Sequence, residues 1–133
     1  MKIRHIIITI VTAALLVLAL QSCSLFGTSI DARIDMFVDD LNYTDRSSAY
    51  TNFHPEETSM YNVLKDPSGT FDTWFNPLSS YDVYNRSESG DTVWADIDGG
   101  IYSGTEIIFY MAKDGLFDWK IESIRLGGSI IID

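Results

Sequence analysis

Cysteine, histidine and proline are scarce in this chain. Its 133 residues include one cysteine, two histidines and three prolines. A single cysteine cannot form a disulfide within the chain, so the fold must depend on the packing of apolar side chains. The same scarcity excludes a zinc or iron site built from several histidines and cysteines. Three Trp, seven Tyr and seven Phe residues supply the large apolar side chains that such packing needs.

Basic residues are also few. Nine Lys and Arg residues stand against nineteen Asp and Glu residues, which gives a formal net charge of −10 at pH 7. Such a surface repels the phosphate backbone of nucleic acids, so we predict no nucleic-acid partner. It is also repelled by anionic membrane surfaces, where a covalent tether would be needed to hold it.

Motifs for cofactors and metal ions are missing. No glycine-rich phosphate loop follows a predicted strand. The segment Asp96-Ile97-Asp98-Gly99 contains two carboxylates of a calcium-binding loop, but it lacks the spacing and the terminal Glu of such a loop. His54 precedes Pro55, where we expect it to end a helix or to lie on the surface. We therefore predict no cofactor, no metal site and no catalytic histidine.

The only long apolar run lies at the start of the chain. Lys2, Arg4 and His5 precede an apolar stretch over residues 6–20, and Cys23 follows shortly after it. This order of charged, apolar and small residues is typical of a bacterial export signal. A transmembrane helix needs about 20 apolar residues, more than this stretch offers.

The end of this stretch, Leu20-Gln21-Ser22-Cys23, resembles the lipobox of bacterial lipoproteins, and relaxed boxes of this kind occur among spirochaete lipoproteins. Gln21 departs from the pattern, because a small or β-branched residue is commoner there. The resemblance implies cleavage before Cys23, acylation of its sulfur and a lipid anchor in the cell envelope. Ser24, where an Asp would favour the inner membrane, favours the outer membrane. Two alternatives stay open: an uncleaved anchor, and soluble secretion with Cys23 as a free thiol.

The remaining chain is long enough for one domain, and we divide it into a signal (1–22), a tether (23–29) and a domain (30–133). Apolar residues recur at helical spacing from Ile30 to Leu41, with Arg33 and the acidic residues largely off the apolar stripe and with Thr28 or Ser29 as the N-cap. Three shorter helical segments are predicted at residues 45–53, 55–64 and 70–75.

Beyond residue 79 the apolar period changes from helical spacing to two, which is typical of strands. Four strands are predicted, and residues 127–132 are expected to add a short edge strand. Both faces of the third strand are apolar, so we place it at the centre of the sheet. The predicted fold class is α+β, with N-terminal helices packed on a curved antiparallel sheet of about four strands. The four predicted strands cover residues 80–86, 91–98, 104–113 and 117–125.

Two stretches of this order resemble the NTF2-like (cystatin-related cone) superfamily, especially its small bacterial lipoprotein members. Residues 37–50, FVDDLNYTDRSSAY, resemble the first helix, the Leu-Asn-x-x-Asp break and the second helix of the family. Residues 109–124, FYMAKDGLFDWKIESI, resemble its closing hairpin. The resemblance covers residues 30–125 and implies a curved sheet wrapped around a long helix, often with an open apolar pocket. The helical segment at residues 55–77 departs from the family and would lie at the mouth of that pocket.

Aromatic residues of the domain are numerous enough to line such a pocket. We expect a non-enzymatic lipoprotein that binds a small apolar ligand or an envelope protein through the cone. The residues predicted to form the ligand site are Tyr50, Trp74, Phe75, Trp94, Asp96 and Phe109. We expect Trp74 and Phe75, with Tyr81 and Tyr84, to lie nearest the mouth.

Two other functions stay open. An NTF2-like isomerase or dehydratase needs a carboxylate of raised pKa beside a hydrogen-bond donor, and Asp96 with Tyr43 or Tyr50 would supply this pair. A structural accessory of an envelope assembly would need neither a pocket nor a ligand.

Overall fold

The computed structural model describes residues 27–43, 45–66 and 69–133. Five strands form one antiparallel sheet in the order β1-β2-β3-β4-β5, so each strand pairs with its neighbour in the sequence. The predicted signal, Cys23 and the first part of the predicted tether lie outside the described residues. The strands are β1 (Asp82–Ser89), β2 (Thr92–Gly99), β3 (Tyr102–Asp114), β4 (Asp118–Leu126) and β5 (Ser129–Ile132).

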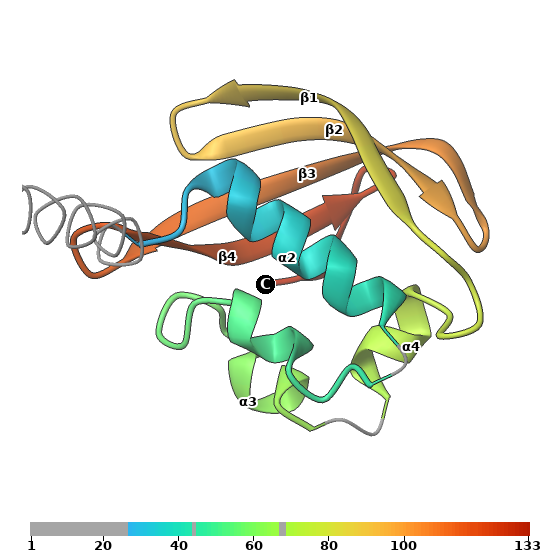
Figure 1. Cartoon of the computed structure of the whole chain (residues 1–133), viewed down its shortest axis with the longest axis horizontal. Coiled ribbons are helices and arrows are strands. Elements are labelled where there is room, and N and C mark those ends of the chain that lie inside the picture. Colours follow the sequence, from blue (N-terminus) through green and yellow to red (C-terminus); the bar gives the residue numbers. More distant parts are fainter. Residues whose placement is uncertain (1–26, 44, 67–68) are drawn as a thin grey trace, which may run out of the picture.

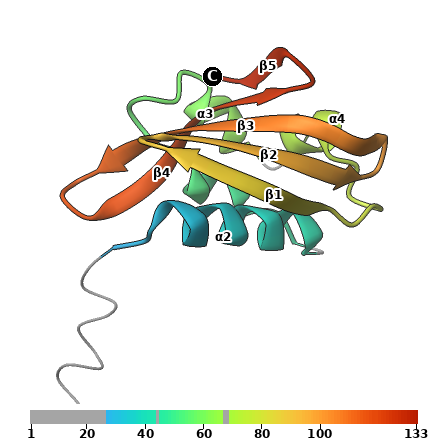
Figure 2. The same cartoon turned by 90° about the horizontal axis from the view of Figure 1, so that it is seen from above.

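Helix α2 (Ile30–Asn42) lies across one face of this sheet, as Figures 1 and 2 show. The side chain of Ser29 accepts a hydrogen bond from the Ala32 amide at 3.2 Å and caps the helix, and Asp31 lies in its positive first turn. The predicted apolar stripe faces the sheet, with Ile34 and Phe37 fully buried. The prediction of this helix from the apolar spacing is therefore confirmed.

Arg33 was predicted to lie largely off the buried face of α2. In the structure it is buried. Its Nε donates to the Trp119 carbonyl at 2.8 Å, and its two terminal nitrogens reach Asn52 Oδ1 at 3.3 Å and Asp118 Oδ1 at 3.0 Å. These partners satisfy the donors of the guanidinium and offset the free-energy cost of removing its charge from water. Arg33 thus joins the start of α2 to strand β4.

Of the three helical segments predicted between α2 and the sheet, those at residues 45–53 and 55–64 are shorter than expected, and the one at residues 70–75 forms nearly as predicted. The structure has a 3₁₀ turn η2 (Ala49–Asn52) and two short α-helices, α3 (Tyr61–Leu64) and α4 (Thr70–Trp74). Hydrogen bonds from this region to strand β4 compete with helix formation, and the His54 amide donates to the Ile121 carbonyl at 2.8 Å. The Thr58 hydroxyl also donates to carbonyls of β4 at 2.9 Å.

The strands follow the predicted alternation. In β2, Val93, Ala95 and Ile97 are buried against the helices, while the residues between them face the other side. Strand β3 is central, as expected from its two apolar faces. The sheet has five strands rather than about four, because the expected edge strand at the end of the chain forms as β5 and pairs with β4.

Phenylalanine rings fill the space between α2 and the sheet. The ring of Phe37 lies 5.6 Å from that of Phe53, 5.9 Å from that of Phe75 and 6.0 Å from that of Phe109, all in edge-on packing. Each of these four side chains is at most 1% exposed. The interior at this level is therefore a packed aromatic core.

Candidate functional site

A hollow of about 570 Å³ lies at one end of the sheet, between α4 and the turn that joins β2 to β3. This volume is within the range of small-molecule sites. Its wall combines aromatic, apolar and neutral polar groups with one carboxylate. The lining residues are Asp72, Thr73, Trp74, Asn76, Pro77, Ser79, Tyr81, Gly100 and Ile101.

The β2–β3 turn approaches Tyr81 so closely that only glycine fits. Gly99 has φ +130°, and a Cβ there would lie 2.2 Å from the Ser80 carbonyl oxygen. A Cβ on Gly100 would lie 2.6 Å from the Tyr81 hydroxyl. Because real Cβ atoms do not approach so closely, the two glycines let the turn form one wall of the hollow.

Tyr81 is held in place from two sides. Its amide donates to Asn42 Oδ1 at 2.7 Å, and its carbonyl accepts from Asn42 Nδ2 at 2.8 Å. Its ring packs edge-on against Phe75 at 5.4 Å and lies 6.5 Å from the ring of Tyr102. The end of α2 therefore positions an aromatic floor for the hollow.

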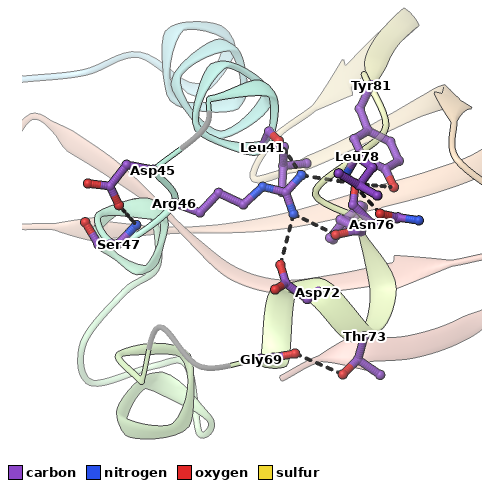
Figure 3. A network of polar contacts seen from close by, with 11 residues as sticks. Leu41, Asp45, Arg46, Ser47, Gly69, Asp72, Thr73, Asn76, Leu78 and Tyr81 are labelled. Carbon is purple, nitrogen blue, oxygen red and sulfur yellow. Dashed lines mark hydrogen bonds and ion pairs between the residues drawn. The ribbon is translucent and has the colours of Figure 1, made fainter.

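The side chain of Arg46 supports the back of the hollow (Figure 3). Its guanidinium donates to the Phe75 carbonyl at 2.6 Å, to the Asn76 carbonyl at 3.3 Å and to the carbonyl of Leu41. It also forms an ion pair with Asp72 at 3.3 Å, whose carboxylate remains about half exposed. The main chain just after α4 is thus tied to the end of α2.

Tyr102 follows the lining residue Ile101 and ties β3 to the end of α4 by donating to the Trp74 carbonyl at 2.8 Å. Burial raises the pKa of the Tyr102 hydroxyl, and the neighbouring Tyr81 contributes in the same direction. The hydroxyl therefore stays a donor at neutral pH. At the outer rim, Ile101 is 89% exposed and Leu78 is 94% exposed.

The six residues predicted as one ligand site do not come together. Only Trp74 lines the hollow. Phe75 and Phe109 belong to the packed core and are fully buried, so neither side chain is open to a ligand. Tyr50 packs edge-on against Tyr61 at 5.7 Å, on the helical side of the sheet.

Trp94 and Asp96 lie on the opposite face of the sheet. Trp94 is 40% exposed and pairs with Ile108 of β3, and Asp96 Oδ2 accepts from Asn85 Nδ2 at 2.9 Å. The sheet therefore separates Asp96 from Tyr50, and the predicted acid–base pair between them is not formed. Tyr43, the other expected donor, is a 70% exposed residue at the end of α2.

His54 is buried rather than on the surface. Its Nδ1 accepts from the amides of Glu56 and Glu57 at 3.1 Å, which leaves Nε2 to donate to the Lys113 carbonyl at 3.0 Å. Every polar atom of the ring is therefore used in holding residues 54–57 against β3. This is a structural role, and it gives the imidazole no open position for chemistry.

Within the described ranges, no group of three or more His, Cys, Asp or Glu residues is placed to hold a metal ion. None of the helices in the same part of the chain combines the length and apolar content needed to cross a membrane.

Three residues that shape the hollow, Arg46, Gly99 and Gly100, were not among the predicted site residues. Arg46 was read only as part of a helix, although an arginine next to a helix end is a natural donor to main-chain carbonyls. Gly99 and Gly100 were read only as turn residues. Their pairing with the aromatic residue at position 81 had no signal in the sequence, because the partners are far apart along the chain.

Comparison of the chain with protein-family models, with curated proteins and with solved structures finds no match in any of the three. The function is therefore argued from the residues and the geometry alone.

Proposed function

We propose that this protein is a lipid-anchored lipoprotein of the bacterial cell envelope, with the outer membrane favoured, that binds a small apolar ligand without catalysis. The single observation that carries the proposal is the placement of two features at opposite ends of β3. The hollow lies at the Tyr102 end, and Thr28, five residues after Cys23 in the sequence, meets the sheet at the Asp114 end (Figure 1).

Strand β3 has 13 residues, which correspond to roughly 40 Å of extended chain. An anchor at Cys23 would therefore leave the hollow facing away from the membrane, open to molecules in the aqueous envelope. This arrangement suits a domain that captures a ligand, because the tether and the binding site do not compete for the same surface.

The lining of the hollow supports a ligand with an apolar or planar body and no negative charge. Trp74 and Ile101 offer apolar surface, and Asn76 and Ser79 offer hydrogen-bonding groups at the edge. Asp72 and the net charge of −10 oppose the binding of anions. The separation of Asp96 from Tyr50 supports binding rather than isomerase or dehydratase chemistry.

We further propose that the domain is NTF2-like. Support comes from the order of one long helix, short helices and an antiparallel sheet that packs on the long helix. In this proposal the phenylalanine core fills the interior that relatives often keep open, and binding moves to the rim.

A second candidate is an envelope protein that docks on the same rim. Leu78 and Ile101 support it, because two large aliphatic side chains beside one hollow are almost fully exposed. A structural role in an assembly would use this same surface without a small ligand.

The test is native mass spectrometry of the full-length protein, extracted with its membrane in polymer nanodiscs so that no detergent enters the hollow. We expect a protein mass that begins at acylated Cys23 and a bound small molecule. Ile101→Glu should remove the bound mass, whereas the control Ile130→Glu, at a 56% exposed isoleucine on β5, should retain it. An acylated protein that carries no small molecule contradicts ligand binding, and an unacylated mass contradicts the anchor.

A further inference from the structure

The hairpin between β3 and β4 carries an apolar tip beside the point where the chain enters the domain. Leu116 at this tip is 79% exposed and Phe117 is 56% exposed. Gly27, the first described residue, lies against the same hairpin: a Cβ on it would be 2.3 Å from the Phe117 carbonyl oxygen. The tip of the hairpin therefore lies next to the point where the chain enters the domain.

Gly27 and Thr28, predicted as part of the tether, lie against this hairpin. The Thr28 amide donates to Asp118 Oδ1 at 3.0 Å, and the Trp119 amide donates to the Thr28 carbonyl at 3.0 Å. Only residues 24–26 separate Gly27 from Cys23. Four residue steps span at most about 14 Å. A lipid on Cys23 would thus hold the hairpin within that distance of the membrane.

The hairpin also projects beyond the rest of the sheet, as the left side of Figure 1 shows. The ladder between β2 and β3 begins at the pair Thr92 and Tyr110, whereas β3 and β4 continue pairing to Asp114 and Asp118. A projecting tip can enter a bilayer without bringing the acidic body of the domain against the lipid headgroups.

The charges near the tip have opposite-charge neighbours: the exposed carboxylate of Asp114 is next in sequence to the exposed Lys113. Asp118 is paired with Arg33 at 3.0 Å, so this carboxylate is compensated. Lys113 Nζ lies 5.2 Å above the ring of Trp119, one step back from the tip. Apolar residues at the tip with Trp and Lys behind them match the order of groups across a lipid–water interface.

We propose that the β3–β4 hairpin, through Leu116 and Phe117, inserts into the bilayer that holds the lipid anchor. The inference rests on the proposed acylation of Cys23. Apolar contacts made by the hairpin would add to the attachment that the lipid provides. Insertion of the hairpin would fix the long direction of β3 relative to the membrane and hold the hollow at the far side.

The scarcity of cysteine makes a direct test available. In the full-length acylated protein, a thiol introduced by Leu116→Cys is the only one open to labelling. The matched control is Ile101→Cys, which replaces an equally exposed aliphatic residue at the opposite end of β3. Each variant is labelled with nitrobenzoxadiazole and reconstituted in phosphatidylcholine–phosphatidylglycerol vesicles with or without doxyl-labelled lipid.

We expect quenching by doxyl lipid at position 116 to exceed that at position 101 by about threefold or more, because an inserted side chain lies several ångströms below the headgroups. Intact mass of the same samples reports acylation. Equal, weak quenching at both positions in acylated protein overturns the hairpin insertion while leaving the proposed anchor standing. An unacylated mass overturns both. A label at 116 that is shielded in native membranes but not quenched in pure vesicles identifies a protein cover and also overturns insertion.

Discussion

The two ends of the domain are each held by an arginine whose side chain is less than a tenth exposed, but the two arginines have different partners. At the chain entry, Arg33 bonds a carboxylate, a carbonyl and an amide side chain. At the hollow, Arg46 bonds three main-chain carbonyls, and its carboxylate partner Asp72 is about half exposed. The end where the chain enters is therefore held mainly by the ion pair between Arg33 and Asp118. The end with the hollow is held mainly by hydrogen bonds from Arg46 to main-chain carbonyls.

The largest expected effect comes from Arg33→Met. This change leaves Asp118 without its ion-pair partner and the Trp119 carbonyl without its side-chain donor, so we expect the free energy of unfolding to fall by about 3 to 4 kcal/mol. Urea unfolding of the full-length protein measures it. Amide exchange should rise at residues 28–33 and 118–120 but not at the hollow.

The control for Arg33 is Arg86→Met. Arg86 forms ion pairs with Asp31 at 3.4 Å and Asp35 at 2.7 Å, and both carboxylates are well exposed. Exposed pairs contribute little, so we expect a loss below about 1 kcal/mol. Equal losses of unfolding free energy in the two variants would show that the buried interactions of Arg33 stabilise the fold no more than the exposed ion pairs of Arg86.

Arg46→Met should have the next largest effect. The carbonyls of Leu41, Phe75 and Asn76 lose a donor, and we expect a loss of about 2 to 3 kcal/mol in the free energy of unfolding. Amide exchange should rise at residues 70–81 and around the β2–β3 turn, and the proposed ligand should bind more weakly. Faster exchange at residues 28–33 instead would contradict the division of the domain into two separately held ends.

Gly99→Ala tests how far the hollow depends on close main-chain approach. A methyl group there meets the Ser80 carbonyl, whereas the same change at Gly90, also at positive φ, meets nothing within 4 Å. We expect Gly99→Ala to cost about 1 to 3 kcal/mol more than Gly90→Ala in thermal or urea unfolding. Similar costs would mean that the turn is free to move away from Tyr81.

The smallest expected effect is a pH dependence at the entry end. Burial raises the pKa of Asp118, but hydrogen bonds from the Thr28 amide and Arg33 outweigh it and hold the pKa below the ordinary value of 3.8. A lowered pKa stabilises the fold above the unfolded-state value, and this contribution is lost as the pH falls through the folded-state value.

The wild-type protein should therefore lose more unfolding free energy than Asp118→Asn between about pH 5 and about pH 2. Urea unfolding at a series of pH values compares the two proteins. Parallel pH profiles of the unfolding free energy would show that protonation of Asp118 does not contribute to destabilisation by acid.

Regular elements were predictable where the signal is local. The spacing from Ile30 to Leu41 predicted α2, and alternation in residues 91–98 predicted β2 with its buried face. Less helix forms in residues 45–53 and 55–64 than predicted. Hydrogen bonds to β4 compete with helix formation there, and the local sequence gives no sign of them.

The candidate site was much less predictable. Aromatic type alone could not tell core from rim, so Phe75 and Phe109 were expected beside a ligand although they pack against Phe37. Arg33 was expected off the buried face, because a lone arginine is normally exposed unless partners arrive to satisfy it. Those partners, Asn52 and Asp118, come from other elements.

By itself, the sequence determined the α+β order, the acidic character, the absence of disulfides and the resemblance of residues 20–23 to a lipobox. These features follow from composition and from patterns that repeat within a few residues. Only the tertiary structure decided that Arg33 and His54 are buried, that residues 72–81 and 99–101 enclose a hollow, and that Gly27 meets the β3–β4 hairpin. Each of these features depends on contacts between groups that are distant in sequence, or on hydrogen bonds that form only in the folded chain. Local sequence patterns do not predict such contacts.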